Sequence, residues 1–143
     1  RVRAGVLVAW DEGQFTGIHT GVLSAGRVVE ATLSDKSGDE LTVIGAYMPT
    51  RDKSDRVVLA EWEAARLAMA GVPNCILAGD LNAELPDALR AAGRTGSPYP
   101  TFADRTFAEM VEEGLYTSLG PEAATYRGRG PGSQLDWLVA DEE

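Results

Sequence analysis

The sequence predicts a single layered domain of the α/β (α+β) class. Its 143 residues match the size of one ordinary domain, and a hydrophobic content of 44% is enough to bury a core. Strand-like runs come first, a long helical stretch lies near the middle, and short helices and strands follow. The chain contains no internal repeat and no low-complexity segment.

Three strand-like segments occupy the N-terminal third. Val6–Trp10 is a short apolar run that ends in acidic and glycine turn residues. Residues 27–33 and 41–47 are rich in β-branched side chains, and the polar stretch between them has the composition of a turn. We therefore expect a strand at Val6–Trp10 and a hairpin formed by the next two strands.

A helix is predicted over residues 54–70. The stretch is rich in alanine, leucine and glutamate, and apolar residues that include Val58 and Trp62 recur in it at helical spacing. Glycine and proline follow it, as is typical of helix ends. We expect Val58 and Trp62 to face a sheet that contains Ile44 and Ile76.

The second half of the chain is predicted to alternate strands and helices. Cys75–Ala78 is an apolar run, in which the thiol behaves as a small buried hydrophobe. The remaining predicted elements are a short helix at 86–92, an amphipathic helix at 107–115, and strands at 125–126 and 135–140.

The charge balance is strongly acidic. The 22 acidic and 13 basic residues give a formal net charge of -9, which repels a polyanion over the surface as a whole. Tight nonspecific binding of nucleic acid by this chain alone is therefore not expected. Arg105, Arg127 and Arg129 form the one local basic group near the candidate site residues.

The sequence carries no sign of a membrane segment or a signal peptide. No apolar run approaches the roughly 18 residues of a membrane span, and the N-terminus leads directly into a strand-like segment. Cys75 is the only cysteine, so no disulfide framework exists. We expect a soluble protein in a reducing, intracellular compartment.

The sharpest chemical signal is the segment Gly79-Asp80-Leu81-Asn82, which follows an apolar strand. Residues two apart in an extended segment point to the same side, so Asp80 and Asn82 could face one site. Asp80 would act as a metal ligand or a water-orienting base, and Asn82 as a hydrogen-bond donor to a phosphoryl oxygen. The alternative is that Asp and Asn follow strands because they form turns readily.

Two further residues strengthen the case for a site. Tyr47 ends the strand that precedes the helix, where its phenol could donate to a phosphate. Asp136 is a lone carboxylate inside an apolar strand, where an ionised side chain is costly unless a partner compensates it. Taken singly, Tyr47 could be a core aromatic and Asp136 a turn cap.

Three segments together resemble the endonuclease/exonuclease/phosphatase superfamily in order and rough spacing. Ala46-Tyr47-Met48-Pro49 is similar to its tyrosine-proline strand end, Gly79-Asp80-Leu81-Asn82 to its Gly-Asp-(Phe/Leu)-Asn motif, and Ser133-Gln134-Leu135-Asp136-Trp137 to its Ser-x-(Ile/Leu)-Asp-(Tyr/Trp) strand. The superfamily includes deoxyribonuclease I, endonucleases of non-LTR retrotransposons, inositol polyphosphate 5-phosphatases and neutral sphingomyelinases. The resemblance implies a deoxyribonuclease I-like fold, a two-layer β-sandwich flanked by helices.

The resemblance also implies roles for individual residues. Asp80 and Asn82 would lie at a divalent cation, Mg²⁺ or Mn²⁺, with Asp80 orienting or deprotonating the attacking water and Asn82 contacting the scissile phosphate. Tyr47 would contact the same phosphate, and Asp136 would pair with a catalytic histidine. Thr125 and Arg127 would help to bind the substrate.

The sequence departs from the family pattern at several points. It contains no Ser-Asp-His motif, and its only histidine, His19, matches no family motif and is expected at the surface. The family's first strand and its metal-binding glutamate would lie before Arg1, and Thr50 stands where an asparagine often occurs. We therefore expect residues 1–143 to be the central part of the domain, without its first and last segments.

The resemblance favours a Mg²⁺-dependent phosphodiesterase acting on DNA, because the compact region from Thr125 to Leu138 is most similar to the retrotransposon endonuclease branch. A phosphatase or lipid phosphodiesterase of the same superfamily would have similar phosphate-handling residues. A third hypothesis is a catalytically incomplete domain that serves as an interaction module. Because the family's histidine and glutamate are absent, we expect little hydrolysis by the 143 residues alone.

Overall fold

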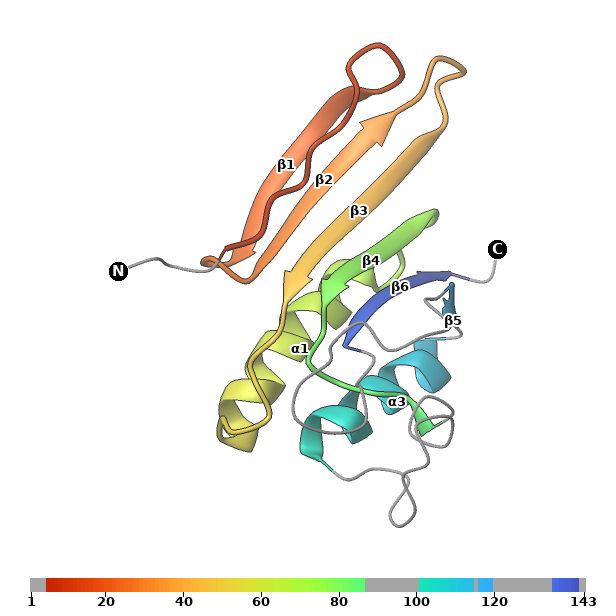
Figure 1. The fold of residues 1–143 in the computed structure, drawn as a ribbon. Coiled ribbons are helices and arrows are strands. Elements are labelled where there is room, and N and C mark those ends of the chain that lie inside the picture. The colour runs from red at the N-terminus through yellow and green to blue at the C-terminus, as the bar shows by residue number, and fades with distance from the viewer. Residues whose placement is uncertain (1–4, 87–100, 115, 120–134, 142–143) are drawn as a thin grey trace.

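The computed structural model describes residues 5–86, 101–114, 116–119 and 135–141. These residues form a six-stranded mixed sheet and two long helices (Figure 1). The elements are β1 (Thr16–Ser24), β2 (Val28–Ser34), β3 (Glu40–Tyr47), α1 (Asp55–Met69), β4 (Cys75–Asp80), α3 (Phe102–Gly114), β5 (Tyr116–Ser118) and β6 (Asp136–Asp141).

The strand order in the sheet is β1-β2-β3-β4-β6-β5. β1, β2 and β3 are antiparallel neighbours, which confirms the predicted hairpin of the second and third strands. β4 is parallel to β3, because α1 carries the chain back along the sheet between them. β6 then pairs antiparallel with β4, so two segments far apart in the sequence meet at the centre of the sheet.

The predicted helix over 54–70 is confirmed as α1. Its apolar stripe is buried, and Trp62 is only 1% exposed. Gly71, just beyond the helix, has a φ of 71°, the left-handed conformation that glycine adopts most easily after a helix end. The predicted second helix is also present as α3, although it begins five residues earlier than the expected Phe107.

Both helices pack on one face of the sheet and form a single core with it. Phe107 of α3 links the layers: its ring stacks on Trp62 at 5.2 Å and meets Trp137 of β6 edge to face at 5.3 Å. Ile44 lies in this core as expected, but Ile76 does not. Leu77 takes that place, because alternate residues of a strand face opposite sides of the sheet.

The segment Val6–Trp10 is not a strand, contrary to the prediction. It lies across the face of the sheet away from the helices. The side chains of Val6 and Val8 there fill the space that a side chain at position 45 would occupy, above Gly45. The ring of Trp10 covers Gly17 in the same way. The apolar run therefore reflects packing on a sheet face rather than hydrogen bonding within a sheet.

The prediction did not include β1, which forms the outer edge of the sheet. This strand contains Gly17 and Gly21, is largely exposed, and pairs with β2 through two irregularities in register. β1 therefore lacks alternating burial, and its sequence lacks the alternation of apolar and polar residues by which a strand is predicted. His19 lies on this strand with its side chain exposed, as expected, and contacts Glu30 at 3.2 Å.

The predicted α/β class and deoxyribonuclease I-like architecture agree with this arrangement. All six described strands belong to one sheet, so the second layer of the expected sandwich is not formed by the described residues. The predicted helix at 86–92 and strand at 125–126 fall largely or wholly outside the described ranges. No helix within those ranges is long and apolar enough to span a membrane.

Candidate active site

Four polar side chains form a row at the ends of the four adjacent strands β2, β3, β4 and β6. In the strand register Tyr47 of β3 lies opposite Asp80 of β4, and Asp80 lies opposite Asp136 of β6. Arg27, which directly precedes β2, is in line with Tyr47, because Val28 pairs with the residue before Tyr47. Adjacent strands of a sheet lie about 4.7–4.9 Å apart, so neighbours in the row are close to each other.

The row lies on the face of the sheet opposite the helices. Ala46 and Trp137, each one residue from a member of the row, belong to the core beneath the helices. Because side chains alternate along a strand, the row points to the other side. Asp136 is exposed, whereas Arg27, Tyr47 and Asp80 are half-buried. Sequence-predicted residues from three separate segments, Tyr47, Asp80 and Asp136, are thus brought together.

Gly79 allows β3 and β4 to approach each other at this point. Its φ is 143°, and a Cβ built there would lie 2.0 Å from the carbonyl oxygen of Ala46. Neither the backbone conformation nor the space accepts a side chain. The close approach of the two strands therefore explains why the Gly-Asp-Leu-Asn segment begins with glycine, and it places Asp80 beside Tyr47.

Asn82 does not continue the strand as the extended-segment argument assumed. β4 ends at Asp80, and Asn82 adopts a left-handed conformation with a φ of 48°. The backbone N–H of Asn82 donates to Asp80 Oδ1 at 3.1 Å, which forms a turn closed by the Asp side chain. The side chain of Asn82 is nearly buried and donates from Nδ2 to the carbonyl of Met48 at 2.8 Å.

The loop that carries Asn82 is held by hydrogen bonds from three directions. The N–H of Leu81 donates to the carbonyl of Leu135 at 2.7 Å, and the indole of Trp137 donates to the carbonyl of Ala83 at 2.8 Å. On the other side, the N–H of Met48 donates to the carbonyl of Asp80 at 2.9 Å. These bonds fix the loop to both neighbouring strands, so the polar groups are positioned before any ligand binds.

A charged cluster of Arg51, Glu84 and Asp104 also holds the loop that carries Asn82. Arg51 donates to Glu84 at 2.9 Å and to the carbonyl of Asn82 at 3.3 Å, and lies 3.6 Å from Asp104. The side chains of Glu84 and Asp104 are 1% and 0% exposed. Asp104 also accepts from the N–H groups of Glu84 and Thr101. One arginine thus compensates two buried carboxylates beside the candidate site.

The electrostatics of the row favour a proton or a cation at Asp80. Burial raises the pKa of the Asp80 carboxyl above its ordinary value, and the neighbouring charge of Asp136 raises it further, against the lowering effect of the Asn82 N–H. Two carboxylates side by side repel each other unless a proton or a metal ion lies between them. A half-buried carboxylate of raised pKa is also suited to accept a proton from water.

The donor set of the row is compatible with Mg²⁺. Asp80 and Asp136 supply hard oxygen ligands, and Mg²⁺ in proteins commonly uses one or two carboxylates while it keeps several waters. Among the described residues, no group of three or more His, Cys, Asp or Glu side chains could hold a metal ion. The described row therefore offers a two-carboxylate site rather than a closed cage. The carbonyl oxygen of the Asn82 side chain, predicted as a ligand, belongs to a nearly buried residue beside it.

Arg27 is the site residue that the sequence interpretation missed. Its guanidinium carbon lies 5.5 Å from the centre of the Tyr47 ring, and its Nη1 donates to the Tyr47 carbonyl at 3.2 Å. The N–H of Tyr47 in turn donates to the carbonyl of Arg27 at 2.8 Å. In the sequence, Arg27 is recognisable only as an arginine that follows a turn glycine at the start of a strand. Many surface arginines stand in the same position.

Of the predicted basic group, only Arg105 is among the described residues, and it is not part of this row. Arg105 is exposed on α3, which covers the opposite face of the sheet. Arg127, Arg129 and Thr125 lie outside the described residues, so their assignment to substrate binding stays a prediction.

The fold matches those of two solved structures. The endonuclease domain of TRAS1, a telomere-specific non-LTR retrotransposon, superposes with a TM-score of 0.69 at 18% identity, and the match covers 92% of this chain and 56% of that domain. The chain has the deoxyribonuclease I-like fold. The human Nocturnin catalytic domain, whose structure holds a sulfate anion, matches this fold with a TM-score of 0.61 at 16% identity over 92% of this chain.

The deoxyribonuclease I-like fold is present here only in part. The chain spans about half the length of these two structures, 56% and 50%. No protein family model matches the sequence, and no curated protein sequence does. The resemblance to the endonuclease/exonuclease/phosphatase superfamily seen in the motifs is thus supported at the level of the fold.

Proposed function

We propose that this chain carries the phosphate-binding part of a Mg²⁺-dependent phosphodiesterase site and that the substrate of the whole domain is DNA. The observation that carries the proposal is the row of Arg27, Tyr47, Asp80 and Asp136 at the ends of four adjacent strands. It combines two carboxylates for a cation with a phenol and a guanidinium for a phosphate. The fold shared with a retrotransposon endonuclease domain supports DNA as the substrate.

Each residue of the row has a defined task in the proposed reaction. Asp80 orients a water molecule and accepts its proton as the water oxygen forms a bond to phosphorus. The bond from phosphorus to the leaving oxygen breaks, and that oxygen keeps the electron pair and takes a proton from solvent. Asp80 and Asp136 would hold a Mg²⁺ ion, whose charge would offset the negative charge on the phosphoryl oxygens. Tyr47 donates to one of these oxygens.

Asn82 and Arg27 assist at the phosphate. One of the two Nδ2 hydrogens of Asn82 is used by the carbonyl of Met48, which leaves the second for a phosphoryl oxygen. Arg27 holds the ring of Tyr47 and adds a positive charge to a chain whose net charge is -9. That local cation is what lets an acidic protein accept an anionic substrate.

The proposal is tested by titrating the chain, labelled with ¹⁵N, with Mn²⁺ and recording the broadening of its backbone amide signals. We expect the signals of Asp80, Leu81 and Asp136 to broaden first and to recover on addition of excess Mg²⁺. The Asp80→Asn, Asp136→Asn double variant should lose this selective broadening. Asp39→Asn, in the exposed turn between β2 and β3, is the matched control.

A second measurement addresses the substrate. A short DNA oligonucleotide, added in the presence of Ca²⁺, should shift the signals of Arg27 and Tyr47, and Arg27→Gln should abolish the shift. Broadening of the signals of all acidic loops would contradict the assignment of the metal site to this row. Shifts induced equally by inositol phosphates would contradict the preference for DNA.

A further inference from the structure

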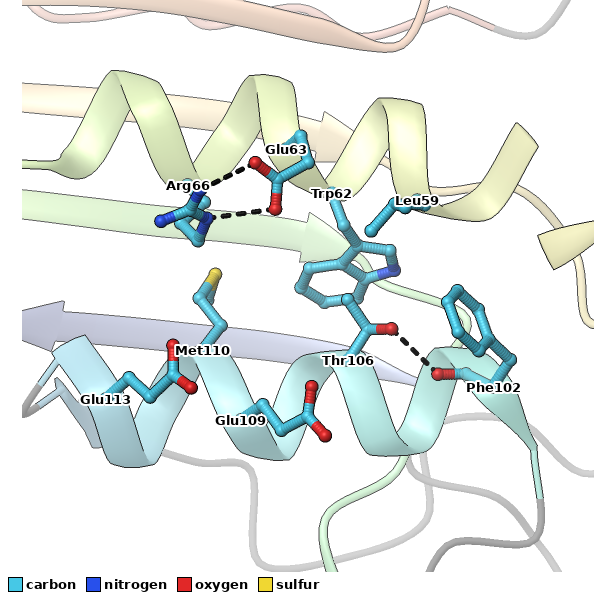
Figure 2. Close-up of a pocket in the computed structure, with 9 residues that line it drawn as sticks. All are labelled: Leu59, Trp62, Glu63, Arg66, Phe102, Thr106, Glu109, Met110 and Glu113. Atoms are coloured by element: carbon cyan, nitrogen blue, oxygen red, sulfur yellow. Dashed lines mark hydrogen bonds and ion pairs between the residues drawn. The ribbon is translucent and has the colours of Figure 1, made fainter. Parts of the chain in front are cut away.

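A groove runs between the two helices, on the side of the sheet away from the candidate active site. It has a volume of about 290 Å³. Figure 2 shows side chains of α1 and α3 pointing toward each other across it. Trp62, Phe102 and Met110 give it apolar walls, and charged residues of both helices form its rim.

The groove contains a buried hydrogen-bond donor that no described residue satisfies. Trp62 is 1% exposed, and its indole nitrogen is buried without a hydrogen-bond partner in the described parts of the chain. A buried donor without an acceptor destabilises the protein that carries it. The indole of Trp137 shows the usual solution, because it donates to the carbonyl of Ala83 at 2.8 Å. Trp62 is therefore suited to a carbonyl oxygen supplied by a ligand.

The rim of the groove carries excess negative charge. Glu109 and Glu113 are exposed and one turn apart on α3. Arg66 of α1 is the only basic residue of the lining, and both its Nε and its Nη2 donate to Glu63, at 3.0 and 2.6 Å. The charge of Arg66 also interacts with that of Glu113. Three carboxylates still face one guanidinium in the described lining, so the rim keeps a net negative charge that attracts a cation.

The size of the groove limits the ligand. Small-molecule pockets commonly enclose about 300–1,000 Å³, so this groove is at the lower limit and suits a single long side chain. An arginine side chain has an apolar stem for the walls and a charged head for the rim, but it has no acceptor. The acceptor for Trp62 must then be the peptide carbonyl beside it.

We propose that the groove between α1 and α3 is a docking site for a basic peptide segment of a partner protein, which inserts an arginine. Its guanidinium binds Glu109 and Glu113, its stem packs on Met110 and Trp62, and a peptide carbonyl accepts from the Trp62 indole. Leu59, 42% exposed, lines the groove beside Trp62. Because the indole nitrogen is buried, the proposal requires Leu59 to turn aside to admit the carbonyl. The site is independent of the proposed hydrolysis, since the helices cover the other face of the sheet.

The test uses the three tryptophan indole N–H signals of the ¹⁵N-labelled chain. The probe is the peptide acetyl-Leu-Arg-Leu-amide, with a citrulline peptide of the same shape as its neutral control. We expect saturable movement of the Trp62 signal to higher proton shift, as a new hydrogen bond forms, while the Trp137 signal stays in place. Trp62→Phe assigns the signal, or sequential assignment does so if that variant does not fold.

The charged rim is tested with variants on the exposed side of α3. The Glu109→Gln, Glu113→Gln double variant should bind the arginine peptide about threefold or more weakly, in line with the modest strength of exposed ion pairs. Glu112→Gln removes an exposed carboxylate of the same helix that does not line the groove, and it should bind like the wild type.

Three outcomes would overturn the proposal. The citrulline peptide could bind as well as the arginine peptide, or Glu112→Gln could weaken binding as much as the double variant. The Trp62 signal could also move with protein concentration in the absence of peptide, which would mean that a second copy of the chain fills the groove.

Discussion

Asp80 and Asp136 lie directly opposite each other on the adjacent antiparallel strands β4 and β6, with both carboxylates on the face of the sheet away from the helices. The sequence places these residues 56 positions apart (136 − 80 = 56). Burial and the charge of Asp136 together raise the pKa of Asp80. Two like charges this close destabilise the fold unless a proton or a cation offsets their repulsion, and the cation proposed above would do so.

The first prediction concerns the pH dependence of stability. The folded pKa of Asp80 lies above its ordinary value of 3.8, so its proton is held more tightly in the folded chain than in the unfolded one. The free energy of unfolding therefore falls as the pH rises from below 3.8 through the raised pKa. Asp80→Asn is neutral at every pH and keeps an oxygen that can accept from the Asn82 N–H. We expect it to be more stable than the wild type near neutral pH, in the absence of divalent cations.

Thermal melts of the wild type and Asp80→Asn at a series of pH values check this expectation. The difference in melting temperature should shrink toward zero as the pH falls below 3.8, where Asp80 is protonated in both states. Asp136→Asn should shift the stability in the same direction, because it removes the neighbouring negative charge that helps to raise the pKa of Asp80. A constant difference at all pH values would show that the carboxylate charge is not responsible.

Gly79→Ala is predicted to destabilise the fold strongly. The new Cβ would lie 2.0 Å from the carbonyl oxygen of Ala46 and would force a φ of 143° on an alanine. Backbone strain and overpacking each cost about 1–3 kcal/mol, so we expect a loss of about 3 kcal/mol or more. Urea unfolding measures it. Gly71→Ala, at a φ of 71° with open space around it, is the control and should cost about 1 kcal/mol.

Arg51→Met is predicted to cost about 3 kcal/mol, because it removes the guanidinium that pairs with the buried carboxylates of Glu84 and Asp104. Arg105→Met is the control, since Arg105 is exposed on α3 and the same change there should be nearly neutral. Equal losses in the two variants would contradict a specific role of the buried cluster.

The sequence predicted the parts of the fold whose burial is periodic. The apolar stripe of α1 is buried, and the β-branched strands β2 and β3 are buried on one side. Their apolar residues therefore recur in the sequence with the period of a helix or a strand. β1 does not bury an alternating set of side chains, and Val6–Trp10 is an apolar run that does not form a strand. In these two cases the tertiary environment, and not the local pattern, decides the structure.

The candidate site was predictable where a motif carries it. Gly79, Asp80 and Asn82 stand in one short segment, and the structure explains that segment by a close strand approach and a left-handed turn. Arg27 and Arg51 could not be found in the same way, because their role depends on partners 20 or more positions away. One signal was present: Thr101 and Asp104 have the spacing of a helix capping box, and Asp104 donates its N–H to Thr101.

Arg27→Gln is predicted to weaken binding of a DNA oligonucleotide while cation binding is kept. The variant removes the positive charge beside Tyr47 but leaves both carboxylates in place. Loss of one phosphate contact should reduce the slope of log affinity against log salt concentration by about 1. Fluorescence anisotropy at several salt concentrations, together with Mn²⁺ titration, separates the two effects. Arg105→Gln is the charge-matched control on the opposite face.

The last prediction is that the 143-residue chain alone hydrolyses DNA weakly or not at all in Mg²⁺, even when it is folded. The chain has one histidine, His19, and it lies exposed on β1 beside Glu30 rather than in the row of Asp80 and Asp136. Loss of a general acid or base commonly lowers the rate by about 10²- to 10⁴-fold, and two carboxylates alone hold Mg²⁺ weakly because the ion keeps its hydration shell. Plasmid nicking by the purified chain and its Asp80→Asn variant checks this. Robust Mg²⁺-dependent nicking that disappears in Asp80→Asn would show that the described row is sufficient for catalysis without an imidazole.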